Sequence, residues 1–417
     1  MTIRNIVNST AWLGLIQLSI YLLPIVTLPV VTRALGPSLF GTLSAIGAVA
    51  GYVGLLVSYG FIYNGPRLIA TLRDEPAKLM EALSAAICVQ FSFAAIGASL
   101  YLLIMAIYAT EYKLISVIIL LGVCSASLSL DWVFLGLDRM RDFALLQVIV
   151  RTIAAGFIFV LIRAPTDALL YVTINACAAV VVACGSFTIL QRSGIRWCIP
   201  SYRIVGSTVR QSAALFLTTV SISLYTTINV ILVNLVLGPT AAGIFALADR
   251  LRAAVTNMLG PIMTAVYPFV CRVSARPITQ EESRIKRLSF LLILITAIIL
   301  SVFLFVFAPL IVSILAGPAF SESVPIVRII AAVPVFIALS NILGVQTMMP
   351  LGMDRIVTLI FACTALVNAG GVLVLSNAFG LRGSALGAIG SEIFLVLALI
   401  FVLAKKMRVI SLFVAIR

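Results

Sequence analysis

The residues of this chain that could do chemistry are charged side chains placed inside long apolar segments. Four of them are arginines, namely Arg151, Arg250, Arg252 and Arg328. Three are carboxylates, namely Asp131, Asp249 and Glu392. A charge at the centre of a membrane helix costs roughly 2.5–3.5 kcal/mol on insertion scales. Such a residue is retained where it faces a polar cavity or a charged partner, so these residues are the first candidates for a functional site.

The balance of these charges favours an anionic substrate. Four arginines against three carboxylates leave a net charge of +1, and arginine binds phosphate or pyrophosphate through two parallel hydrogen bonds. Arg151 is the deepest of the four. Asp249 and Arg252 are three residues apart and share a helix face, so we expect them to form an ion pair. Arg250 lies about 100° around the helix from Asp249 and is the better candidate for a cavity cation.

Arg328 and two further arginines, Arg33 and Arg67, lie near the ends of apolar segments. Arg328 could reach a substrate or extend to the lipid headgroups. Arg33 and Arg67 follow the first two segments, where basic residues usually set the orientation of the chain or contact lipid headgroups. We keep all three as candidate substrate-binding residues.

The carboxylates have two possible roles. Glu392 lies in the middle of the last apolar segment, where it is either a counter-ion for one of the arginines, which we favour, or a group that couples transport to H⁺ or Na⁺. The same two roles are open to Asp131 and Asp249.

The composition identifies the surroundings of these residues as lipid. Of the 417 residues, 62% are apolar and only 10% are charged, and the mean hydropathy is +1.22. A soluble domain is roughly 45–50% apolar and about one quarter charged. The composition therefore excludes a water-soluble enzyme, a disordered chain and a nucleic-acid-binding module.

Residue types needed for catalysis or metal binding are scarce. Histidine is absent, and the seven cysteines show no C-x-x-C spacing. We find no G-x-S-x-G motif and no glycine-rich phosphate loop, and the loops between apolar segments are mostly too short to form a separate domain. We therefore expect a protein that is not an enzyme and needs no cofactor or metal.

Charged and Pro/Gly-rich positions divide the chain into twelve apolar segments. They are residues 9–31, 42–64, 82–108, 114–135, 143–162, 168–190, 212–237, 241–270, 288–313, 324–350, 356–376 and 383–404. Each is close to the ~20 residues that a helix needs to cross the hydrocarbon core. The sequence thus predicts an all-α polytopic membrane protein with twelve transmembrane helices.

Basic residues predict the orientation of these helices. If the N-terminus is cytoplasmic, 20 of the 28 Lys and Arg residues fall in cytoplasmic loops or tails, 4 fall on the opposite side and 4 lie inside segments. Cytoplasmic loops are the ones that collect Lys and Arg. We therefore expect both termini in the cytoplasm.

Two short motifs occur once in each half of the chain. Leu35-Gly36-Pro37 matches Leu237-Gly238-Pro239, and the stretch 135–139 (LGLDR) matches 351–355 (LGMDR). Both matches pair segment n with segment n+6, which predicts two parallel six-helix lobes around a central cavity. The expected regions are a lobe at 1–190, a basic cytoplasmic linker at 191–211, a lobe at 212–404 and a cytoplasmic tail at 405–417.

Prolines inside the segments are candidate gating positions. Pro24 and Pro29 lie in the first segment, and Pro261 and Pro268 lie in the eighth. Proline removes a backbone hydrogen bond that lipid cannot replace, so these positions predict kinks, although proline is also simply commoner in membrane helices.

The order of these motifs resembles that of a known family. It begins with Asn8, the stretch 29–36 (PVVTRALG) with Phe40-Gly41, then Gly60 and 67–70 (RLIA). It continues with 131–140 (DWVFLGLDRM), Leu237-Gly238-Pro239 with Gly243, and Tyr267-Pro268. Over almost the whole chain this pattern is similar to the Wzx-type polysaccharide flippases of the multidrug/oligosaccharidyl-lipid/polysaccharide export superfamily. Many members carry Gln where this chain has Leu135, so a sugar-facing role of that position is not expected.

The resemblance implies a two-lobed fold like that of the multidrug and toxin extrusion (MATE) transporters of this superfamily. It also implies a flippase in the bacterial inner membrane that carries undecaprenyl-pyrophosphate-linked oligosaccharide to the outer leaflet, for O-antigen or exopolysaccharide synthesis. The expected partners are membrane lipids, a coupling H⁺ or Na⁺, a polysaccharide polymerase and a chain-length regulator, and no nucleic acid.

Three other functions compete with this one. A cation-coupled multidrug exporter of the same superfamily would have the same architecture but would more naturally show unpaired acids than surplus arginines. A major-facilitator carrier would place its Gly/Asp/Arg-rich motif between segments two and three, whereas here the nearest look-alike follows segment four. A membrane glycan polymerase is the least favoured, because such enzymes are expected to have a large external loop.

Overall fold

The computed structural model describes residues 3–108, 110–274 and 279–414, and the described part of the chain contains helices and no β-strand. The chain divides into two units, Met1–Val220 and Ser221–Arg417, which we call unit 1 and unit 2. The all-α polytopic class expected from the composition is confirmed.

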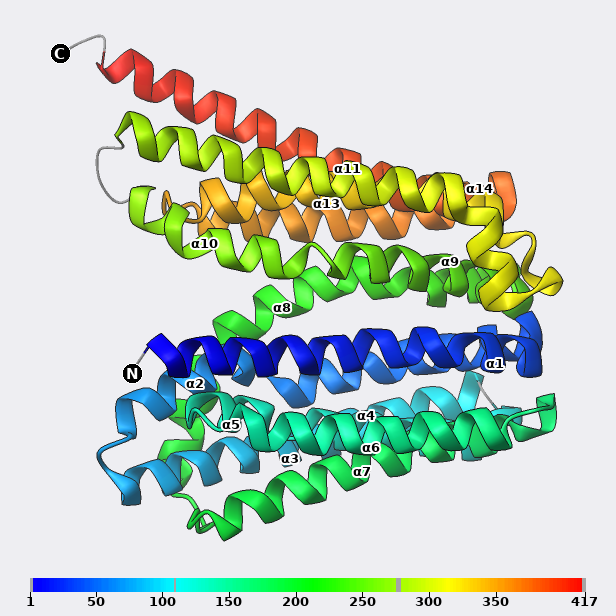
Figure 1. The fold of residues 1–417 in the computed structure, drawn as a ribbon, viewed down its shortest axis with the longest axis horizontal. Helices are drawn as coiled ribbons and strands as arrows, with labels where there is room; N and C mark the ends of the chain where they lie inside the picture. Colours follow the sequence, from blue (N-terminus) through cyan, green and yellow to red (C-terminus); the bar gives the residue numbers. More distant parts are fainter. Residues whose placement is uncertain (1–2, 109, 275–278, 415–417) are drawn as a thin grey trace. The chain divides into compact units, whose positions relative to one another are not determined.

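Unit 1 is a bundle of long helices that lie side by side (Figure 1). Its helices are α1 (Ile3–Ser58), α2 (Phe61–Leu72), α3 (Pro76–Tyr108), α4 (Lys113–Ser127), α5 (Asp131–Gly136), α6 (Met140–Leu161), α7 (Ala168–Arg192) and the first part of α8 (Tyr202–Leu237). Two single 3₁₀ turns, η1 (Thr110–Tyr112) and η2 (Pro165–Asp167), precede α4 and α7. Residues 202–211 of the predicted linker are thus helical, and residues 193–201 are not.

Unit 2 also consists of helices, several of them long. It contains the rest of α8, then α9 (Pro239–Asn257), α10 (Gly260–Ser274), α11 (Gln280–Ala316), η3 (Pro318–Phe320), α12 (Ser323–Ile330), α13 (Val333–Ser340), the π-helix η4 (Asn341–Met348) and α14 (Asp354–Val414). In both units many large apolar side chains are exposed, among them Phe303 and Phe305 on α11, as expected for helices that face lipid.

Two helices are too long to be single membrane spans. α1 has 56 residues and α14 has 61, so at 1.5 Å per residue each would measure about 80–90 Å if straight, against a hydrocarbon core of about 30 Å. Each is broken at one glycine, Gly36 (φ 70°) and Gly380 (φ 59°). Positive φ is easy for glycine because it has no Cβ.

The helices fit the twelve predicted segments. Eight helices of the described chain are long and apolar enough to cross a membrane, or nine if α9 and α10, which are bent by 40° at their junction, form one span. Because α14 contains two predicted segments, and α1 contains one and most of a second, fewer helices than segments are expected. The count of twelve and the orientation remain predictions.

The first sequence match marks the same backbone geometry in both units. Gly36 has φ 70° and ψ 173°, and Gly238 has φ 84° and ψ 177°. This region is essentially restricted to glycine, and in both places a proline follows and begins the next helix. The two motifs therefore specify the same turn.

The second match marks similar turns but is out of register. At the end of α5 and at the end of η4, an N–H donates to the carbonyl five residues earlier, at 2.9 and 3.1 Å. The left-handed residue of the turn is Asp138 (φ 59°) in one and Gly352 (φ 72°) in the other. The sequence match had paired Gly352 with Gly136, which is wrong by two residues. Aspartate tolerates the left-handed region better than most side chains, so identical letters did not mark identical geometry.

Candidate functional site

The candidate site is a small polar cavity inside unit 2. Its polar lining comes from Asn229 on α8, Asp249 and Arg252 on α9, and Asn368, Ser391 and Glu392 on α14. The cavity measures about 20 Å³, which is room for about one water molecule. It therefore suits a proton, a water molecule or a small ion, and it is far too small for a sugar.

Asp249 and Arg252 form the ion pair that their spacing predicted. Arg252 Nε lies 2.8 Å from Asp249 Oδ1, and the side chains are 13% and 23% exposed, respectively. Because the residues are three apart on α9, one turn of helix is sufficient to bring them together.

Hydrogen bonds link the uncharged polar side chains that line the cavity. Asn368 Nδ2 donates to Asn229 Oδ1 at 2.6 Å, and the Ser391 hydroxyl donates to Asn368 Oδ1 at 3.0 Å. Asn368 and Ser391 belong to the two arms of α14, before and after the break at Gly380. The break thus allows residues 23 positions apart to meet across a buried contact.

Glu392 is the unusual member of the cavity. Its side chain is buried, with the residue only 5% exposed, and its Oε2 has no hydrogen-bond partner within the described residues. An isolated buried carboxylate is costly, so this group must be protonated or have a cation nearby. Arg252 lines the same cavity, which leaves both roles expected for Glu392 open.

In unit 1 the structure gives Arg151 a neutral partner. Arg151 lies near the middle of α6, is partly buried, and follows Gln147 by one helical turn. With the Gln147 amide turned so that its oxygen faces the guanidinium, this oxygen accepts hydrogen bonds from Arg151 Nε at 2.8 Å and Nη2 at 3.1 Å. Within the described residues Arg151 makes no ion pair, so its positive charge is not neutralised by a carboxylate.

Asp131 lies neither in the cavity of unit 2 nor at the Gln147–Arg151 contact of unit 1. It is the first residue of α5, after Leu130 in the left-handed conformation (φ 58°), and its Oδ1 accepts the backbone N–H of Trp132 at 2.9 Å. Its placement is that of a residue at a helix start.

The remaining predicted arginines lie on exposed surfaces. Arg33, Arg67, Arg250 and Arg328 are all exposed, and neither Arg250 nor Arg328 lines the cavity of unit 2. The Arg328 guanidinium lies 5.6 Å from the centre of the Phe305 ring on α11, a contact in the range of a cation–π interaction.

The predicted gating prolines differ among themselves. α1 stays helical through Pro24 and Pro29, and the Thr32 hydroxyl donates to Leu28 O at 2.8 Å. Pro268 likewise lies inside α10, whereas Pro261 is the second residue of α10, directly after the bend that separates it from α9. Of the four, Pro261 alone coincides with a break of the helix; gating by any of them remains a prediction.

The sequence analysis missed the uncharged half of the cavity. Asn229, Asn368 and Ser391 were not singled out, because we searched for charges. Two asparagines within strongly apolar segments were the available signal, since an amide in a membrane helix also needs a partner. Within the described residues no group of three or more Cys, Asp or Glu side chains could hold a metal ion.

Comparison with known proteins gives a consistent result. Residues 6–274 match the family described as polysaccharide biosynthesis protein. A protein of Escherichia coli (strain K12), whose name proposes O-antigen transport, is 28% identical over 97% of this chain and 98% of its own length. A protein of Shigella dysenteriae with the same name is 25% identical over 90% of this chain and 94% of its own length.

Solved structures share the fold at low sequence identity. An inward-facing MATE multidrug transporter of the MOP superfamily matches with a TM-score of 0.72 at 13% identity, over 97% of this chain and 98% of that one. The lipid II flippase MurJ in an inward closed conformation matches with a TM-score of 0.65 at 12% identity, over 95% of this chain and 87% of that one. The fold is therefore MATE-like.

Proposed function

Because this chain belongs to the polysaccharide biosynthesis protein family, we propose that it is a flippase for lipid-linked oligosaccharides. The cargo is an undecaprenyl-pyrophosphate-linked repeat unit, moved from the cytoplasmic to the outer leaflet for O-antigen or exopolysaccharide synthesis. The relatives named for O-antigen transport, which match this chain over nearly their full length, support this assignment.

The observation that carries the proposal is the pairing of Arg151 with an amide. Gln147 satisfies two hydrogen bonds of the guanidinium but leaves its charge unbalanced. An anionic pyrophosphate supplies the missing negative charge and can accept the remaining N–H groups bidentately. Arg250, Arg67, Arg33 and Arg328 remain further candidates for contacts with the cargo.

The polar cavity of unit 2 is proposed as the coupling site. Asp249 and Glu392 against Arg252 give its lining an excess of one carboxylate, which favours the uptake of H⁺ or Na⁺. The cavity is small enough for such an ion and too small for the cargo. Coupling at a separate site lets an ion gradient drive movement of a large anionic lipid.

The proposed location rests on the family resemblance, and the proposed orientation rests on the charge distribution. We place the protein in the bacterial inner membrane with both termini in the cytoplasm, in keeping with the count of 20 basic residues on that side against 4 on the other. The predicted lobes, 1–190 and 212–404, would enclose the cargo path. A polymerase and a chain-length regulator are the expected partners, because they would use the flipped repeat unit.

Proteoliposomes that contain the purified protein and a fluorescent undecaprenyl-pyrophosphate oligosaccharide would test the flippase function directly. Flipping is read as the fraction of fluorophore that becomes accessible to a membrane-impermeant quencher. We expect flipping by the wild type and a loss of about tenfold or more in Arg151→Ala or Arg250→Ala, the value of one charge-assisted contact. Arg163→Ala, in the turn before η2, is the matched control and should flip normally.

The multidrug-exporter alternative predicts the opposite outcome. The MATE-like fold and the carboxylates of the unit 2 cavity are the observations in its favour. In the same vesicles it predicts transport of a cationic dye and none of the lipid-linked oligosaccharide, which would refute the flippase proposal.

A further inference from the structure

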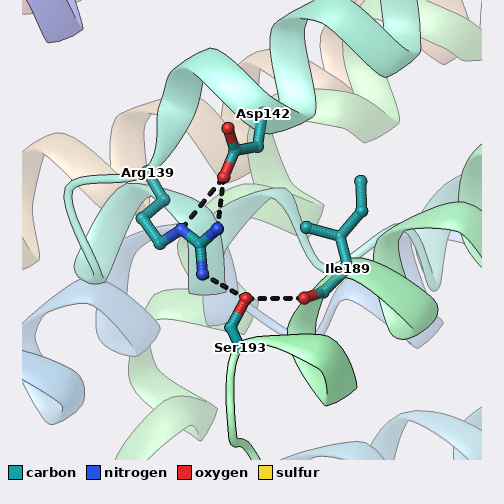
Figure 2. A network of polar contacts seen from close by, with 4 residues as sticks. All are labelled: Arg139, Asp142, Ile189 and Ser193. Carbon is teal, nitrogen blue, oxygen red and sulfur yellow. Dashed lines mark hydrogen bonds and ion pairs between the residues drawn. The ribbon is translucent and has the colours of Figure 1, made fainter.

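The non-helical segment 193–201 between α7 and α8 is attached to unit 1 along its length; we call it the strap. Figure 2 shows how its first residue is held. Arg139 Nε and Nη2 donate to Asp142 Oδ2 at 3.0 and 2.6 Å, and Arg139 Nη1 donates to the Ser193 hydroxyl oxygen, whose own proton goes to Ile189 O at 2.6 Å. The turn before α6 and the end of α7 are thus joined where the strap begins.

The rest of the strap is fixed to α3 and α7. The backbone N–H of Cys198 donates to Ser84 Oγ at 3.0 Å, and that of Ser201 donates to Glu81 Oε1 at 3.3 Å. Trp197 packs edge-on against Phe187, with ring centres 5.5 Å apart. These contacts give the backbone of the strap a defined conformation, so the same residues remain exposed.

The strap and its two flanks carry four exposed arginines with exposed apolar residues between them in the sequence; we refer to these residues together as the face of the strap. Arg192, Arg196, Arg203 and Arg210 are all exposed. Ile199 is 98% exposed and Tyr202 is 79% exposed. A loop that only faced water would not need such apolar side chains on its surface.

Neighbouring carboxylates do not neutralise these arginines. Asp142 is bound by Arg139, and Asp138 is bound by Arg73 at 3.2 Å. Glu81 accepts the N–H of Ser201 and keeps its charge, but it is a single carboxylate beside four arginines. Within the described residues, none of the four arginines of this face forms an ion pair. The face therefore carries a surplus of positive charge.

We propose that this face binds anionic phospholipid headgroups of the surrounding leaflet. The strap follows α7, which is long and apolar enough to cross a membrane, so it begins at a bilayer surface. Arginines near an anionic surface gain attraction that falls off within a Debye length. Ile199 and Tyr202 can enter the boundary between headgroups and acyl chains while the arginines stay with the phosphates. A soluble polyanion would account for the charges but not for the exposed apolar groups.

A polarity-sensitive fluorophore on Ile199→Cys, in full-length protein whose native cysteines are replaced, tests this proposal. The labelled protein is placed in nanodiscs of phosphatidylcholine with increasing phosphatidylglycerol. We expect the emission to shift to shorter wavelength as phosphatidylglycerol is added, and to return at an ionic strength of about 1 M, where the Debye length is about 3 Å. Changing Arg192, Arg196, Arg203 and Arg210 to Gln should raise the phosphatidylglycerol fraction needed for half the shift by about tenfold or remove the shift.

Two variants keep this test decisive. Lys at the same four positions should retain the response, which separates loss of charge from misfolding. Gln at Arg272, Arg284, Arg287 and Arg355 of unit 2 removes the same number of cytoplasmic charges and should leave the response unchanged. Since 16 of the 20 basic residues assigned to the cytoplasm remain in either variant, the orientation should be kept.

The proposal is overturned if phosphatidylglycerol gives no shift, or if both four-Gln variants lose it equally. It is also overturned if the probe responds to undecaprenyl pyrophosphate in phosphatidylcholine but not to phosphatidylglycerol, since the strap would then recognise the cargo. The assay measures no transport, so its outcome is independent of the flippase proposal.

Discussion

Arg151 in unit 1 and Arg252 in unit 2 show how the partner of a membrane arginine decides its role. Both lie within long helices, and both bind a residue one turn earlier on the same helix. Arg252 binds the carboxylate of Asp249, whereas Arg151 binds the amide of Gln147. The first cation is neutralised within the fold, and the second is held in place with its charge still available.

We therefore expect loss of the arginine to have a different effect in each unit. In unit 2 the pair lines one cavity with Asn229, Asn368, Ser391 and Glu392, and removing its cation leaves a carboxylate without its ion-pair partner, which should damage the fold. In unit 1 removal of the cation leaves a neutral amide, which should damage the binding of an anion instead. Each prediction below tests one side of this contrast.

The largest effect is expected at the ion pair of unit 2. Arg252→Ala leaves Asp249 as a partly buried carboxylate without its cation, which typically costs about 3–5 kcal/mol. We expect a strong fall in membrane abundance and in the thermal unfolding temperature of the purified protein. The double variant Asp249→Asn/Arg252→Gln removes both charges and should recover most of the loss. Normal abundance of Arg252→Ala would show that the pair does not support the fold.

The next effect concerns function and not folding. Arg151→Ala should keep the abundance and unfolding temperature of the wild type while reducing flipping by about tenfold or more, which corresponds to about 1.5–3 kcal/mol for a charged hydrogen bond. Arg151→Lys should recover part of the activity, because it keeps the charge but lacks the planar fork. Unfolding of Arg151→Ala, as for Arg252→Ala, would abolish the distinction between the two units.

Smaller and equal effects are expected at the turn that both units share. Gly36→Ala and Gly238→Ala place a Cβ in a backbone region that is nearly closed to other residues, at a cost of about 1–3 kcal/mol each. Thermal unfolding should show similar losses for the two. Gly47→Ala, in regular helix with open space around the position, should be neutral or slightly stabilising. Unequal losses of thermal stability at residues 36 and 238 would indicate that the two turns contribute differently to the stability of the fold.

The smallest change in stability is expected at Glu392. Glu392→Gln preserves shape and removes a carboxyl group that lacks a partner at one oxygen, so we expect the free energy of unfolding to stay within about 1 kcal/mol of wild type. Flipping in proteoliposomes should then no longer respond to an imposed H⁺ or Na⁺ gradient. A variant that still responds fully would remove the cavity from the coupling proposal.

Features that depend only on residues close together in the sequence could be predicted from local sequence patterns. Helix content and the Asp249–Arg252 pair follow from hydropathy and from a three-residue spacing, and the matched Leu-Gly-Pro motifs identified the same turn in both halves. The Gln147–Arg151 contact is equally local, but a search for charged pairs passed over the amide.

Other features depend on contacts that are distant in sequence. The cavity of unit 2 requires the break at Gly380, which brings Asn368 to Ser391 and Glu392, and hydropathy gives no sign of which asparagine meets which partner. The second motif match failed by two residues because the left-handed position can be filled by either glycine or aspartate. Long-range partners and exact register are therefore the parts that sequence pattern left undetermined.

The π-helix η4 has a consequence for how the chain tolerates deletions. Its hydrogen bonds span five residues, as in the bond from Met349 N to Gly344 O at 3.0 Å, so it holds more residues per turn than an α-helix. Removing one residue from η4 could restore α-helical bonding while keeping the flanking side chains on their original faces. The same deletion in the middle of α11 would turn every following side chain by about 100° and expose its buried face. A deletion scan of unit 2 should therefore show an island of tolerance at 341–348.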